Sequence, residues 1–262
     1  PPLDERALCD ASGCDCRVMR TTNGGQAAAR NLASRQARGR ILAFTDDDCE
    51  PDSGWLRGLL QRHDAATEPR IVGGRTVNRL SANPFAIASQ NLITFGYAHY
   101  NRDPDRARFF ASNNLSVPRA EFALLGGFDE RFRTAEDRDL CDRWVHSGRT
   151  MTYAPESLIH HAHTMGLAGF WRQHLAYGRG AYRFHAAHRR RNPDHRVVEW
   201  PYYRTLLVSM LPPRGAHATP ARAFALGVSQ IANLLGFFFE RSTSRPGFRN
   251  DCPTRATDVR QE

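Results

Sequence analysis

A short apolar run, Ile41–Phe44, leads directly into three consecutive aspartates, Asp46, Asp47 and Asp48. An apolar run of this length is typical of a strand covered on both faces, as in a parallel sheet. Ligands of open α/β sheets bind beyond the carboxyl ends of the strands. Adjacent carboxylates repel one another unless a cation or hydrogen-bond donors offset the repulsion. The pattern therefore indicates either a divalent-cation site at a sheet edge or a solvated acidic turn that caps the next helix.

Short apolar runs and helical patterns alternate along most of the chain. Strands are expected at residues 17–20, 41–44, 71–72, 115–117 and 158–159. Helices are expected at residues 26–38, 55–63, 84–100, 119–125 and 136–147. Such alternation is typical of an α/β fold, in which helices flank a sheet.

The chain changes character after residue 169, where it becomes aromatic and basic. A long helix is expected at 170–188, and further apolar stretches follow at 203–211 and 223–239. The last stretch is shorter than the about 20 apolar residues that a spanning helix needs, so an interfacial or packed helix is expected. We expect a core at residues 1–165, a helical extension at 166–241 and a disordered polar tail at 242–262.

The composition favours acidic partners. The chain has 36 basic residues, all of them arginine, against 27 acidic ones, which gives a net charge of +9. Sugar nucleotides, lipid phosphates and anionic membrane surfaces all suit such a charge. The six cysteines lack the paired spacing of a zinc site or a disulfide framework, so reduced thiols are expected.

Residues 23–31 and 39–48 together resemble the donor-binding half of the family-2 glycosyltransferases. The resemblance implies that Asp46 and Asp48 form the D-x-D motif. Asp46 would hold the nucleoside side, and Asp48 would hold a divalent metal, Mg²⁺ or Mn²⁺, with the diphosphate. Contacts to the nucleotide are implied for the residues that precede this motif: Gly25, Arg30 and Asn31.

Three later segments, residues 111–119, 126–130 and 135–140, resemble the acceptor-side block of the same family. The resemblance implies that Asp137 is the general base, since a carboxylate can take the proton of an attacking hydroxyl. The acceptor pocket would then be shaped by Asn114, Glu136 and Asp139. A simpler alternative is that Thr134 and Asp137 only cap the helix that follows.

Three histidines, His160, His161 and His163, follow the strand expected at 158–159. Many family members carry a histidine here that completes the metal site. His161 lies best in register for this role, and His163 is next. The alternative is a nonspecific surface cluster.

The resemblance extends over residues 17–184 and implies a GT-A, Rossmann-like fold: a mixed, mostly parallel sheet flanked by helices, with a C-terminal helical extension. It also implies inverting transfer of a sugar from a nucleotide-diphosphate sugar to a hydroxyl of a glycan or lipid-linked acceptor. Residues 171–180 depart from the Q-x-x-R-W motif of processive synthases, which disfavours polymer synthesis. Nothing before Arg17 resembles the first strands of the family, so an incomplete nucleotide pocket and low activity are expected of this chain.

The rival hypothesis is a noncatalytic basic protein that binds a membrane surface or nucleic acid. It depends on the net charge and on the arginines at 189–191. No helix-turn-helix, zinc-finger or RNA-binding signature is present, so nucleic acid is not an expected partner. Contact with an anionic membrane is compatible with the enzyme, and we expect a cytoplasmic protein that associates with the inner face of the plasma membrane.

Overall fold

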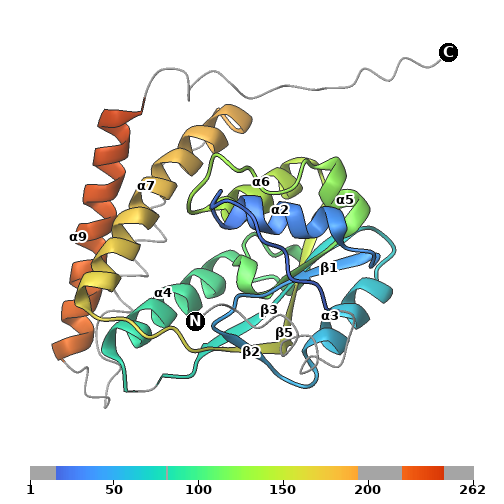
Figure 1. Ribbon diagram of the computed structural model, residues 1–262, viewed down its shortest axis with the longest axis horizontal. Helices are drawn as coiled ribbons and strands as arrows, with labels where there is room; N and C mark the ends of the chain where they lie inside the picture. Colours follow the sequence, from blue (N-terminus) through green and yellow to red (C-terminus); the bar gives the residue numbers. More distant parts are fainter. Residues whose placement is uncertain (1–15, 81, 194–219, 245–262) are drawn as a thin grey trace.

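The computed structural model describes residues 16–80, 82–193 and 220–244, and these residues form one sheet flanked by helices (Figure 1). The strands are β1 (Ile41–Phe44), β2 (Cys49–Pro51), β3 (Arg70–Asn78), β4 (Leu115–Pro118) and β5 (Thr150–His161). The helices are α2 (Gln26–Gln36), α3 (Trp55–Asp64), α4 (Pro84–Tyr100), α5 (Arg119–Leu124), α6 (Glu136–His146), α7 (Leu167–Arg191) and α9 (Pro220–Thr243). Two short 3₁₀ turns, η1 (Pro104–Arg106) and η2 (Ser112–Asn114), precede β4.

The five-stranded sheet has the order β1-β4-β3-β5-β2. Only the β3–β5 ladder is parallel among the described strands, and the other three ladders are antiparallel. The expected mixed sheet between helices is confirmed, whereas its mostly parallel character is wrong for these strands. An apolar run does not encode strand direction. Thus β1 pairs antiparallel with β4. Ala43 of β1 is exposed, so this strand is not buried on both faces.

Successive residues of β3 point into separate cores on the two faces of the sheet, as the two-residue period of a strand requires. Ile71 belongs to the larger core, which contains Trp144 of α6 and aromatic side chains from α4 and α5. Val72 belongs to the smaller core, where Trp55 and Leu59 of α3 pack. The sheet is therefore covered by α3 on one face and by α4, α5 and α6 on the other.

Helices α7 and α9 lie side by side at one end of the molecule (Figure 1). Their axes approach closely because glycines stand at the contact: a Cβ at Gly178 would overlap the carbonyl of Asn233, and one at Gly236 that of Leu175. Glu240 of α9 is 3% exposed and accepts hydrogen bonds from Arg179 and Arg183 of α7. The pair is thus joined by both backbone packing and charge.

The expected helices are all present, with ends that differ by a few residues. The strand expected at 17–20 is wrong, since residues 16–25 form neither helix nor strand, and β2 was not expected because it has only three residues. α9 continues to Thr243, past the expected start of the tail, while residues 203–211 lie outside the described residues. The domain division stays a prediction. No described helix is long and apolar enough to cross a bilayer.

Candidate active site

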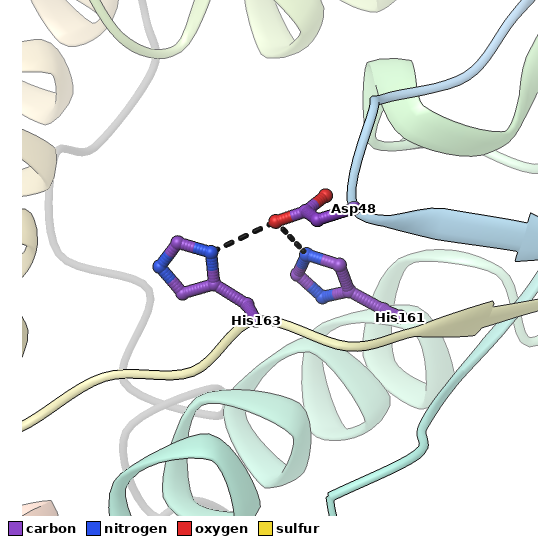
Figure 2. Close-up of side chains that lie close together, drawn as sticks. All are labelled: Asp48, His161 and His163. Carbon is purple, nitrogen blue, oxygen red and sulfur yellow. Dashed lines mark hydrogen bonds and ion pairs between the residues drawn. The ribbon is translucent and has the colours of Figure 1, made fainter. Parts of the chain in front are cut away.

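Asp48, His161 and His163 come together at one edge of the sheet (Figure 2). The Oδ2 atom of Asp48 lies 3.2 Å from Nε2 of His161 and 2.8 Å from Nδ1 of His163. The donor atoms of the three side chains all lie within 4.8 Å of one another. A carboxylate and two imidazoles at this separation are a suitable ligand set for a divalent cation.

The backbone holds this cluster in place. Asp48 directly precedes β2, whose first residue, Cys49, is the partner of His161 in the antiparallel β2–β5 ladder. The N–H of Ala162 donates to the carbonyl of Asp48 at 2.9 Å. His160 lies on the other side of the strand and contacts Asp52 instead, at 3.0 Å. The alternation of β5 therefore places His160 and His161 on opposite sides of the strand, and of the three histidines only His161 and His163 contact Asp48.

The acidic triplet does not cap the next helix. Gly54 is the N-cap of α3, with no side-chain cap hydrogen bond, and the N–H of Trp55 donates to the backbone carbonyl of Asp52. Burial by itself would raise the pKa of Asp48, but the hydrogen bonds and charges of His163 and His161 outweigh burial and lower that pKa. The Asp48 carboxylate is therefore held in the ionised form that a metal ligand needs.

A second group of charges centres on Arg30 of α2. Its guanidinium donates to Asp46 at 2.6 Å and to Glu136 at 2.9 Å. Asp46 lies two residues before Asp48, and Glu136 directly precedes Asp137. One arginine therefore connects the loop that carries the cation cluster with the start of α6.

Asp137 occupies the first turn of α6 and is half-buried. Its Oδ1 accepts a hydrogen bond from the N–H of Arg138 at 2.7 Å, and its Oδ2 accepts one from the N–H of Ser112 at 3.3 Å. The capping alternative does not hold, because Ala135 is the N-cap and the Thr134 hydroxyl donates to the carbonyl of Ala176 in α7. Ala135 has φ 68°, a left-handed conformation that is unusual outside glycine.

The two adjacent carboxyl groups of α6 both have raised pKa values. Burial raises the pKa of Glu136 to about 7, the negative charge of Asp137 adds to the effect, and Arg30 opposes it. Burial likewise raises the pKa of Asp137, against the hydrogen bonds from Arg138 and Ser112. A carboxyl group with a raised pKa is a stronger base once it is ionised, which suits proton acceptance near neutral pH.

Comparison with known proteins shows which family the chain resembles. Residues 5–121 match the family described as Glycosyl transferase family 2, and over this range the chain is similar to that family. The match begins before residue 17, where the sequence analysis places the start of the resemblance.

Two curated relatives support this similarity. The Pre-mycofactocin glycosyltransferase of Mycobacterium tuberculosis is 30% identical over 173 residues, which are 64% of this chain and 37% of that protein. The O-antigen chain rhamnosyltransferase WbaN of Salmonella anatum is 25% identical over 148 residues, which are 54% of this chain and 46% of that protein. The chain thus spans less than half the length of these relatives.

A solved structure supports the fold. The mannosyltransferase PcManGT from Pyrobaculum calidifontis, solved in complex with GDP-Man and Mn²⁺, superposes with a TM-score of 0.52 at 18% identity. The similarity covers 88% of this chain and 59% of that chain. The expected GT-A fold is confirmed.

Two residues expected to shape the acceptor pocket, Asn114 and Asp139, are buried. Asn114 is fully buried: its Oδ1 accepts from the indole N–H of Trp55, and its Nδ2 donates to the carbonyls of Arg75 and Ser157. Asp139 is 1% exposed and is neutralised by Arg143 and Arg191, at 2.7 and 2.9 Å. Their charge and polarity satisfy buried neighbours, and their part in an acceptor pocket stays a prediction.

Two of the three residues expected along the nucleotide, Gly25 and Asn31, differ in position. Asn31 is 5% exposed, and its amide bonds the backbone of Phe128 and the carboxylate of Glu130, so it positions the loop before α6. Gly25 has φ +94° and precedes α2, which has no side-chain cap. Gly25 has no side chain that could cap the first N–H groups of α2, and such a helix start suits an anion such as a phosphate.

Tyr177 of α7 is a neighbour of the site that the sequence did not single out. The residue as a whole is 43% exposed, but the protein around its phenol raises the pKa of that group by desolvation, and the negative charges of Asp137, Glu136 and Asp46 raise it further. Gln173 donates to the phenol oxygen at 2.9 Å. The phenol thus lies within electrostatic range of both acidic groups of the site. An aromatic residue on a long helix carries no sequence signal for such a role.

Proposed function

We propose that this protein transfers a sugar from a nucleotide-diphosphate sugar to an acceptor hydroxyl, with inversion at the anomeric carbon and assistance from a divalent metal. One observation carries the proposal: Arg30 links Asp46, beside the cation cluster, to Glu136, beside Asp137. A cation site and a candidate base therefore lie in one network. Transfer of a sugar from a diphosphate to a hydroxyl uses positive charge at the diphosphate and a base at the hydroxyl. The noncatalytic alternative is not favoured, because it explains neither the network nor the similarity to the family.

Each residue of the network has a distinct proposed part. Asp137 accepts the proton of the acceptor hydroxyl while that oxygen attacks the anomeric carbon and the bond from this carbon to the diphosphate oxygen breaks. A single displacement of this kind inverts the anomeric centre. Arg30 and the N–H groups at the start of α2 compensate negative charge on the nucleotide, and Asp46 holds the nucleoside side. Asp48 and His161 would hold a divalent ion, which would supply positive charge beside the diphosphate leaving group.

The experiment that tests the base is Asp137→Asn in the full-length protein. General-base assistance contributes about 10²–10⁴-fold to rate, so we expect kcat to fall by at least about 10²-fold while the Kd for the nucleotide changes little. Turnover and calorimetric binding are measured on the same preparation. The substitution also removes one of the two oxygen atoms of Asp137 that accept hydrogen bonds. A melting curve separates this structural effect from the loss of the base.

Asp47→Asn is the matched control for this experiment. Asp47 is exposed. Its substitution by Asn removes one negative charge, as Asp137→Asn does, but from the loop that carries Asp48. We expect near wild-type kcat in this variant. Loss of a general base should lower kcat by about 10²–10⁴-fold. If Asp137→Asn keeps more than about a tenth of the wild-type kcat, another residue is the base.

A further inference from the structure

The cluster of Figure 2 contains one imidazole more than a site built from Asp48 and His161 alone. We propose that His163 is a third protein ligand, and that the site therefore selects a first-row divalent transition ion over Mg²⁺ and binds it before the nucleotide arrives. The inference rests on the proposed function, since it concerns the metal of that same site. It adds a specificity-determining residue and an order of binding.

The distances suit a single ion shared by all three side chains. Donor atoms bound at about 2.1 Å and at right angles around one ion lie about 3 Å apart. The Oδ2 atom of Asp48 lies 3.2 Å from the His161 donor atom and 2.8 Å from the His163 donor atom. An ion can therefore replace the present hydrogen bonds with little movement of the backbone.

The chain direction explains why two histidines reach one carboxylate. His161 is the last residue of β5, and His163 follows two residues later, so both side chains extend from the same side of the chain. Their rings are close to parallel, at an interplanar angle of 22°. The ladder with β2 holds His161 beside Asp48, and His163 contacts the same carboxylate from the adjacent position along the chain (Figure 2).

The ligand chemistry determines the choice of ion. Mg²⁺ prefers oxygen ligands, keeps several waters, and is usually bound through one or two carboxylates together with substrate phosphates. Imidazole nitrogen instead favours first-row transition ions, and Mn²⁺ has the lowest affinity among them, so a preference for Mn²⁺ over Mg²⁺ is the strictest test of this choice. Two imidazoles and one carboxylate supply three protein ligands without any phosphate. The site can therefore hold a transition ion in the nucleotide-free protein, where Mg²⁺ would lack most of its preferred ligands.

The site also remains open to a substrate. The side chains of Asp48 and His163 are 31% and 41% exposed, so water or phosphate oxygens have access to the remaining coordination positions. A closed four-ligand structural site would not allow this access. Three protein ligands with open positions are typical of an ion that takes part in chemistry.

The chain provides its own comparison in His160 and Asp52. This pair has the same residue types at a similar distance, 3.0 Å, and lies on the same two strands or directly beside them. The pair has one imidazole fewer than the cluster. His160→Ala therefore removes a histidine from the same strand without removing a ligand.

The test is calorimetric titration of Mn²⁺, and separately of Mg²⁺, into the nucleotide-free protein, with electron paramagnetic resonance to count free Mn²⁺. We expect Mn²⁺ to bind at one site and Mg²⁺ to bind at least about tenfold more weakly. His163→Ala should weaken Mn²⁺ binding at least about tenfold, whereas His160→Ala should leave it unchanged. Because the His163 side chain is 41% exposed and lies beyond β5, the variants should fold normally, and melting curves in chelator check this.

Three results would overturn the proposal while the proposed function stands. One is equal Mn²⁺ affinity in His163→Ala and wild type. Another is Mg²⁺ binding as tight as Mn²⁺ binding in the nucleotide-free protein. The third is Mn²⁺ binding that occurs only when UDP or GDP is present. If Mn²⁺ binds neither with nor without these nucleotides, both this proposal and the metal assistance in the proposed function are wrong.

Discussion

Arg30 places one cation between two carboxylates, and its effect on them differs. Asp46 is 29% exposed at its side chain, whereas Glu136 is only 6% exposed there. Water therefore shares the solvation of Asp46, but Glu136 depends almost wholly on the protein. The raised pKa of Glu136 shows that one shared arginine does not offset the cost of burying this charge beside Asp137.

This imbalance predicts a pH-dependent stability. The folded pKa of Glu136 is about 7 against an ordinary value of 4.5, so between these values the folded protein binds a proton that the unfolded chain releases. The free energy of unfolding must then fall as pH rises through that window, by up to about 3 kcal/mol. Gln at position 136 cannot ionise. Between pH 4.5 and about 7, the difference in free energy of unfolding between wild type and Glu136→Gln should therefore change by up to this amount. Urea unfolding at several pH values measures it, and parallel curves for the two proteins would contradict it.

Asp48 and Asp47 offer a second comparison at the residue scale. Asp48→Asn replaces a charged metal ligand by a weak neutral one, while both proteins should keep similar melting temperatures because the Asp48 side chain is partly exposed. We expect calorimetry to show no Mn²⁺-dependent binding of UDP or GDP in Asp48→Asn. Asp47→Asn should bind as the wild type does, because Asp47 is exposed. Equal binding in all three proteins would remove Asp48 from the metal site.

At the scale of elements, helices were predicted better than strands. Pro84–Tyr100 has Asn83 as a capping residue and a proline at its start, and both of its predicted ends are confirmed. β2 has three residues and no apolar pattern, so its pairing with β5 could not be read from the sequence. That pairing is decisive for the site, because it determines which histidines face Asp48.

The contact between α7 and α9 depends on glycine and gives a prediction at this scale. A Cβ at Gly236 would overlap the carbonyl of Leu175, whereas a Cβ at Gly227 of the same helix meets nothing within 4 Å. Gly236→Ala should therefore destabilise the protein by about 1–3 kcal/mol through overpacking. Gly227→Ala should stabilise it by up to about 1 kcal/mol through helix propensity. Urea unfolding measures both, and equal effects of the same sign would show that α7 and α9 are not in close contact.

At the scale of the whole molecule, the motifs predicted which segments meet but not every contact that their side chains make. The motifs predict that three segments meet: the acidic triplet, the Glu136–Asp137 pair and the histidines. Arg30 joins the first two, because it forms ion pairs with both Asp46 and Glu136. The burial of Asn114 and Asp139 depends on partners from distant elements, Trp55 and Arg191. Such partners are invisible to local patterns. For the same reason, Tyr177 was missed.

The outer side of α9 is the largest feature that the proposed reaction leaves unexplained. The helix buries Ala225, Ser229 and Ala232 against its neighbours, while its opposite side carries apolar residues that are at least half exposed: Phe224, Ile231, Leu234, Leu235, Phe238 and Phe239. α9 lies at one end of the molecule, beside α7 (Figure 1). Exposed Arg241 lies seven residues after Leu234 and three after Phe238, on the same side of the helix. An apolar surface beside a cation, on a chain of net charge +9, suits an anionic bilayer.

We therefore predict that α9 binds the surface of anionic vesicles, in line with the expected location at the inner face of the plasma membrane. Ile231→Ser with Phe238→Ser should reduce cosedimentation at least about tenfold, because each buried apolar side chain contributes about 1.5–3 kcal/mol. Leu124→Ser is the matched control, since Leu124 is 75% exposed but lies on α5. Added salt should weaken binding, because exposed charges are screened over about 8 Å at physiological ionic strength. Equal recovery with neutral and anionic vesicles would exclude the electrostatic contribution. A stable dimer in vesicle-free solution that the double variant disrupts would assign the apolar side of α9 to a second copy of the chain instead.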